Sequence, residues 1–207
     1  MDKTSERLAH LLQKAQSEYS ETHFVVRVPE FLSKKFIGYC SMKEDLELAL
    51  EYIKILSQHP DKIIKSALTI SLISLYAKCF ADASKNNYPK LEHEKIFKDY
   101  ADHYKIHGYL VDLRHQLIAH RGKSENEVGI AYMSIPKDEK EQSQIRFSQL
   151  KQTSFSSGDL SKMEVLFEFL IPFIENKIQI NGQKIYEAML DSFSAKQLSQ
   201  MGINNIK

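Results

Sequence analysis

The sequence SALTISLISLYA, residues 66–77, is the most apolar stretch of the chain and carries no charge. Lys65 and Lys78 flank it. At about 1.5 Å per residue, a helix of this length spans about 18 Å, which is short of the ~30 Å hydrocarbon core of a bilayer. We therefore expect it to lie in a buried helix, about residues 61–84, at the centre of a soluble protein, and we expect no membrane span.

Amphipathic helices are predicted on both sides of this central helix. Apolar residues recur at intervals of three and four, as Leu46, Leu50 and Ile53 do. Ser41 precedes Glu44 by three residues, which is a capping-box pattern for a helix that starts near residue 42. Gly108 could interrupt a long charged helix, and Asn181-Gly182 predicts a turn. The expected helices cover about residues 4–20, 31–39, 42–57, 61–84, 92–121, 159–179 and 183–192.

Two alternating segments between residues 127 and 150 predict a β-hairpin. Val128, Ile130 and Tyr132 alternate before the charged turn 137–141, and Ile145 and Phe147 alternate after it. We therefore predict a mostly α fold: an up-and-down bundle of four to five long helices with a small hairpin insertion at 127–150. It would form a single domain over residues 1–207, with C-terminal helices at 159–192.

The composition narrows the class of protein. The 28 Lys and Arg against 27 Asp and Glu give a net charge of +1, which excludes a strongly basic protein that coats nucleic acid but allows a local basic patch. Cys40 and Cys79 are the two cysteines. They are typical of reduced thiols, so we expect a cytoplasmic location. The GxGxxG, GxxxxGK[ST] and GxSxG motifs are absent.

The residues best suited to chemistry lie in LRHQLIAHRG, residues 113–122. Arginine presents a charged fork of donors that fits a phosphate, and histidine can take or give a proton near neutral pH. Together they could hold a phosphodiester and activate an RNA 2′-hydroxyl without a metal. On a regular helix Arg114 and His120 lie about 120° apart. They would meet only through the reach of Arg114, a local irregularity of the helix or a second subunit.

Residues Arg114 to His120 resemble the Arg-x(4–6)-His motif of HEPN-domain proteins. That family comprises all-α bundles, often homodimeric, and many members are metal-independent endoribonucleases of toxin–antitoxin or abortive-infection systems. The resemblance implies that Arg114 and His120 form the catalytic pair and that His115, the polar residue after the Arg, assists. It also implies RNA as substrate, no cofactor, a homodimer, and an antitoxin or other protein as a partner.

Two alternatives to the nuclease use the same motif. His120 and Arg121 precede Gly122, a helix-ending residue, where cations stabilise the helix dipole, and Arg114 could pair with an acid on a neighbouring helix. Some HEPN relatives lack nuclease activity, so the resemblance also allows a non-catalytic module for dimerisation or binding.

Further histidines lie upstream on the same predicted helix. His103 and His107 have i, i+4 spacing. With Arg114 they could line the same anion-binding cleft as His120, and we expect Arg121, His107 and His103 to bind the substrate. The same spacing permits a metal site, with His93, Asp99 or Asp112 as a third ligand. A solvated or core-edge pair is the plainer interpretation. Tyrosines 100, 104 and 109 alternate with lysines and could stack on unpaired bases, although acidic residues nearby dilute the charge.

Overall fold

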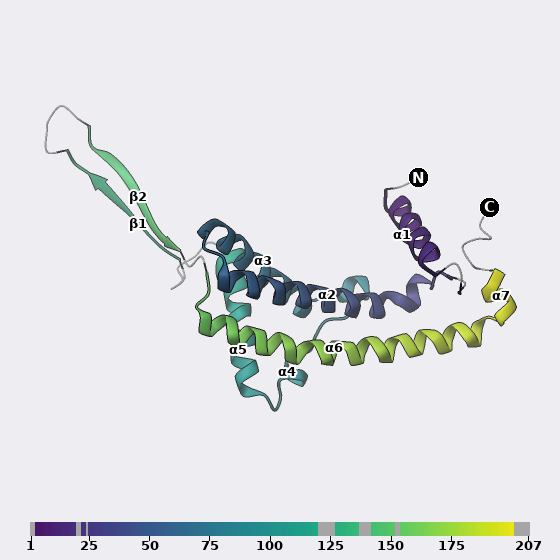
Figure 1. Cartoon of the computed structure of the whole chain (residues 1–207). Helices are drawn as coiled ribbons and strands as arrows, with labels where there is room; N and C mark the ends of the chain where they lie inside the picture. Colours follow the sequence, from purple (N-terminus) through teal and green to yellow (C-terminus); the bar gives the residue numbers. More distant parts are fainter. Residues whose placement is uncertain are drawn as a thin grey trace. The chain divides into compact units, whose positions relative to one another are not determined.

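The structure, a computed structural model, describes residues 3–19, 22–23, 25–119, 127–136, 142–151 and 154–200. Figure 1 shows α1 (Lys3–Tyr19), α2 (Glu30–Gln58), α3 (Lys62–Phe80), α4 (His93–Ile96), α5 (Ala101–Leu113), β1 (Glu127–Ser134), β2 (Gln144–Lys151), α6 (Ser157–Ser192) and α7 (Ala195–Gln200). Two short segments complete the order, the 3₁₀ helix η1 (Ser84–Asn86) and the π-helix η2 (Arg114–Ala119). The predicted mostly α class with a small hairpin is confirmed.

The predicted central helix is α3, and Asp61 explains where it begins. The Asp61 Oδ1 accepts hydrogen bonds from the backbone N–H groups of Ile63 (2.7 Å) and Ile64 (3.1 Å). These bonds satisfy two donors that have no partner inside the helix, and they lower the pKa of the Asp61 carboxyl. The sequence suggested a helix that is buried on all sides, but α3 is buried on only part of its surface. Tyr76 is fully buried, whereas Ile70 on another side is 41% exposed.

Among the described helices, α3 alone is long and apolar enough to cross a membrane by length and composition. Core helices of soluble proteins pass the same test. The location of the protein in the cell therefore stays a prediction.

The chain divides into two compact units, whereas the sequence suggested a single domain. One unit comprises Met1–Tyr39 and Asn176–Lys207, and the other comprises Cys40–Glu175. The long helices α2 and α6 contribute residues to both units.

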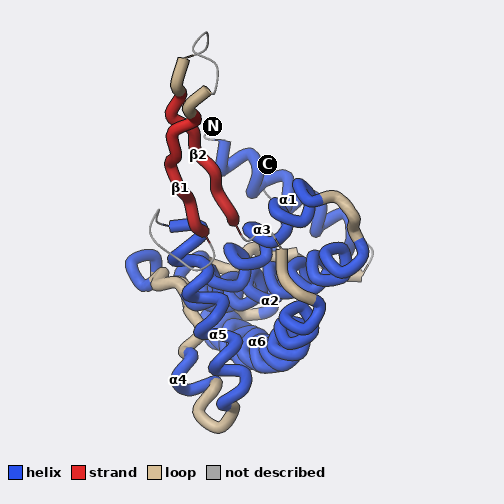
Figure 2. Tube along the Cα trace, turned by 90° about the vertical axis from the view of Figure 1, so that its left-hand side faces the viewer, coloured by secondary structure: helices blue, strands red, loops and turns tan. Residues whose placement is uncertain are grey.

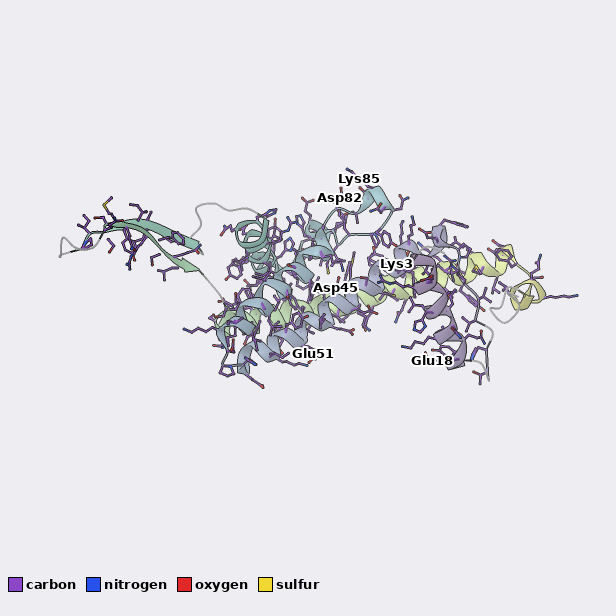
Figure 3. All side chains as sticks on the ribbon, turned by 90° about the horizontal axis from the view of Figure 1, so that it is seen from above. Lys3, Glu18, Asp45, Glu51, Asp82 and Lys85 are labelled. Atoms are coloured by element: carbon purple, nitrogen blue, oxygen red, sulfur yellow. The ribbon has the colours of Figure 1, made fainter. Side chains whose placement is uncertain are left out.

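The larger unit holds most of the buried core. Within it α2 and α6 lie side by side and antiparallel, and Lys43 on α2 pairs with Glu175 on α6 at 2.8 Å (Figure 1). Lys78 on α3 pairs with Asp45 on α2 at 2.7 Å, and Figure 3 labels Asp45 on its helix. The largest fully buried side chains among the described residues of this unit are Leu46, Leu72, Ile73, Tyr76, Cys79, Leu110, Leu113, Met163, Leu166, Phe167, Leu170 and Ile174. They come from α2, α3, α5 and α6, and Figure 2 shows these helices in blue.

Two predicted interruptions of helices are wrong. The expected helices 31–39 and 42–57 form the single helix α2, which continues through Ser41 because Met42 and Leu46 are buried on its core side. The expected helices 159–179 and 183–192 form the single helix α6. The Asn181 side chain donates a hydrogen bond to the Lys177 carbonyl (2.7 Å) instead of making a turn. Gly182 lies within α6, and a Cβ there would lie 3.4 Å from the Phe36 ring of α2.

The long charged helix is interrupted, but before Gly108 rather than at it. The helix α4 ends at Ile96, and α5 begins at Ala101 after a turn in which the Tyr100 N–H donates to the Phe97 carbonyl (3.0 Å). Ile96 and Phe97 are both buried. Ile96 is the last residue of α4, and Phe97 is its C-cap, whose N–H donates to the His93 carbonyl at 2.9 Å.

The hairpin 127–150 is confirmed in place and in pattern. Strands β1 and β2 pair antiparallel, with Ile130 opposite Ser148 and Ala131 opposite Phe147 (Figure 2). Val128, Ile130 and Tyr132 therefore share one face, and Phe147 lies on the other. The Phe147 ring lies over Gly129, where a Cβ would come within 2.9 Å of it.

Candidate functional site

Arg114 begins the π-helix η2 directly after α5. Its N–H donates to the carbonyls of Leu110 and Val111. Leu110 and Leu113 are 0% and 1% exposed, and they anchor the end of α5 in the core. π-Helical turns are rare and occur frequently at functional sites. The motif thus contains a local irregularity of the helix over Arg114–Ala119.

The side chains of Arg114 and His115 are exposed at this point. Among the described residues, none forms an ion pair with Arg114. The guanidinium is therefore available to an anion from solution, as far as the described part of the chain determines. His120 and Arg121 lie outside the described residues, as does Gly122.

His107 lies in the core and does not face a site. It is 6% exposed, and its Nδ1 shares a hydrogen bond of 2.9 Å with the Tyr76 hydroxyl. Its ring lies 4.5 Å from the Phe80 ring and 5.0 Å from the His93 ring, between centroids. Burial, together with the charge that His93 can carry, lowers the pKa of His107 to about 4. His107 is therefore neutral near pH 7 and shielded from a polymeric substrate.

His103 lies one turn earlier on α5 and faces a different environment. It is half-buried against Phe169 of α6, with ring centroids 4.5 Å apart, and stacks on Tyr100 at 5.8 Å. It lines an open groove of about 670 Å³ between α5 and α6, with Asp102, Lys105, Ile106, Ser161, Lys162 and Val165. Ser161, Lys162 and Val165 were not predicted, because only the packing of α6 on α5 brings them to this groove.

The structure therefore separates His103 from His107, which the i, i+4 spacing had grouped. One lines the groove and the other is hydrogen-bonded in the core. Among the described residues, no three His, Cys, Asp or Glu side chains form a group that could hold a metal ion.

Both cysteines are free thiols. The Cys79 Sγ is buried and donates to the Leu75 carbonyl at 3.5 Å, and burial raises the pKa of this thiol to about 12. Burial likewise raises the pKa of Cys40. Neither thiol is activated as a nucleophile, because the thiolate is the reactive form.

Comparison with models of protein families, with curated proteins and with solved structures found no match for this chain.

Proposed function

We propose that the protein is a HEPN-like, metal-independent endoribonuclease, of the kind found in toxin or phage-defence systems. The observation that carries the proposal is the state of Arg114: exposed, without an ion pair among the described residues, and placed on a π-helix. A purely structural arginine would be expected to pair with a neighbouring acid. The motif residues Arg114, His115 and His120 supply the proposed chemistry.

In the proposed reaction, Arg114 binds the non-bridging oxygens of the scissile phosphate and stabilises the charge that develops on them. His120 removes the proton from the 2′-hydroxyl, and that oxygen attacks the adjacent phosphorus. The bond from phosphorus to the 5′-oxygen breaks, and His115 donates a proton to the departing oxygen. The products are a 2′,3′-cyclic phosphate and a 5′-hydroxyl, so no water, metal or other co-reactant is consumed.

Substrate binding in this proposal uses Arg121 near the motif, and His103 with Lys105 and Lys162 farther along α5 and α6. Lysines at the groove can meet phosphates, and the exposed Tyr100 ring can stack on an unpaired base. His107 has no part in binding because it is buried. A homodimer in the cytoplasm and an antitoxin partner belong to the same proposal through the family resemblance.

Replacement of Arg114 tests this function. We expect Arg114→Ala to slow RNA cleavage by about 100-fold or more, because the developing charge loses its principal donor. Arg114→Lys should restore part of the rate, since it keeps the charge but not the fork of donors. The matched control is Arg146→Ala, which removes an equally exposed arginine from β2. Cleavage at the wild-type rate by folded Arg114→Ala protein would remove the assignment.

A non-catalytic HEPN-like binding module is the second candidate. It is favoured by the hairpin, on which Ile145 and Leu150 are 71% and 80% exposed. Apolar surface of this extent commonly marks a site of protein–protein interaction. Absence of RNA cleavage by wild-type protein and by every variant would favour this candidate.

A further inference from the structure

We infer that the hairpin is a dimerisation arm, in which β1 pairs antiparallel with β1 of a second copy of this chain. The inference does not depend on ribonuclease activity. It follows from the exposure of the hairpin, from the charge pattern of its two strands and from the symmetry of strand pairing.

The hairpin carries large apolar side chains that no described part of the chain covers. On one face Val128, Ile130 and Tyr132 are 53%, 59% and 45% exposed. On the other face Met133 and Phe147 are 58% and 67% exposed. Figure 3 draws the side chains of the two strands as sticks. A two-stranded hairpin is at best marginally stable in water, whereas a sheet of three or more strands with an apolar face is stable.

The two strands differ in how their outer edges are protected. Edge strands usually carry charged residues, proline or a bulge that discourages pairing. Each strand has one charged residue at its end, Glu127 on β1 and Lys151 on β2, but β2 also carries Arg146 within the strand, whereas β1 carries no charge, no proline and no bulge from Val128 to Ser134. Its residues in this stretch are VGIAYMS, with Val, Ile and Tyr among the strongest strand formers. β1 is therefore the edge that is open to a further strand.

A second copy fits this edge. Two β1 strands related by a two-fold axis normal to the sheet run antiparallel, and each face of one hairpin continues into the same face of the other. With the axis at Ile130 or Ala131, Ile130 of one chain lies opposite Ile130 or Tyr132 of the other. No like charges meet, because Glu127 is the one charged residue of β1 and it lies at the end of the strand. The product is a four-stranded sheet in the order β2-β1-β1-β2.

A matched pair of substitutions in the full-length protein tests this arrangement. Ile130→Lys on β1 places two lysines close together across the two-fold axis. Ile145→Lys makes the same change on β2, at a residue that is 71% exposed and lies away from the proposed edge. Sedimentation equilibrium measures the dimer dissociation constant of each, and circular dichroism checks that the helices remain folded.

We expect wild-type protein to be a dimer at micromolar concentration. Ile130→Lys should weaken dimerisation by at least about tenfold, and Ile145→Lys should leave it nearly unchanged. A wild-type monomer would overturn the inference, and the free edge of β1 would then be expected to pair with a strand from another protein. A dimer unaffected by Ile130→Lys, or weakened equally by both variants, would also overturn it. RNA cleavage is not part of this measurement. A failure of the dimerisation inference can therefore be told apart from a failure of the proposed nuclease activity.

Discussion

Histidine residues in this chain occupy environments that differ sharply over short distances. His103 lines a groove, His107 is hydrogen-bonded to Tyr76 in the core, and His115 is exposed in the motif. The i, i+4 spacing alone does not separate His103 from His107. Burial of His107 depends on Tyr76, which lies on another helix 31 residues away. Sequence periodicity could predict the anchoring leucines Leu110 and Leu113, because their spacing is local.

The buried His107 makes stability depend on pH. Its pKa falls from an ordinary value of 6.5 to about 4 on folding, so the unfolded chain binds the proton more readily between these values. Stability is therefore fully present above pH 6.5 and is lost as the pH falls toward 4. We expect His107 to contribute a loss of about 2 kcal/mol between pH 7 and pH 5.

Urea unfolding of wild-type and His107→Leu protein at the two pH values measures this contribution. The variant should be less stable at pH 7, because the Tyr76 hydroxyl loses its partner, but it should lose less stability on acidification. His10→Leu, at an exposed position, is the control and should follow wild type. An equal loss for wild type and His107→Leu would show that His107 titrates as an exposed histidine does.

At the scale of elements, the sequence predicted a boundary correctly where the neighbouring residues and the tertiary packing favour the same structure. The start of α3 near residue 61 and the alternating pattern of the hairpin strands follow from neighbouring residues alone. The breaks expected at Ser41 and at Asn181-Gly182 do not occur: Met42 and Leu46 are buried on the core side of α2, and the Asn181 side chain donates to the Lys177 carbonyl within α6. The break between α4 and α5 lies at residues 97–100, where the sequence has neither glycine nor proline to mark it.

A substitution at Gly182 tests whether α6 is one continuous helix or is interrupted by the predicted turn. None of the described glycines has a positive φ, and a Cβ on Gly182 would lie 3.4 Å from Phe36, at the near limit of ordinary contact. Gly182→Ala should therefore raise the free energy of unfolding by up to about 1 kcal/mol, because alanine favours the helix.

Gly108→Ala is the matched control, since a Cβ there meets nothing within 4 Å. It should stabilise α5 by a similar amount. Thermal or urea unfolding gives both values. A clear loss of stability for Gly182→Ala alone would indicate a turn with positive φ at residues 181–182 and would contradict a continuous α6.

At the scale of the whole molecule, the residues that form the core differ from the residues that we propose to be functional. The helical core of Cys40–Glu175 is formed by α2, α3, α5 and α6, and none of its fully buried side chains comes from the hairpin. The hairpin is thus free to serve association, while the end of α5 presents Arg114 and His115 to solvent. How this motif acts depends on His120, which lies beyond the described end of η2.

RNA cleavage by purified wild-type and His120→Ala protein in EDTA tests the central claim most directly. His10→Ala, which removes an exposed histidine from α1, is the control. We predict that wild type and His10→Ala cleave RNA at equal rates without a divalent metal, and that folded His120→Ala protein does not, because the 2′-hydroxyl has lost its base. Cleavage by His120→Ala at the wild-type rate, or wild-type cleavage that requires a metal, would contradict the account.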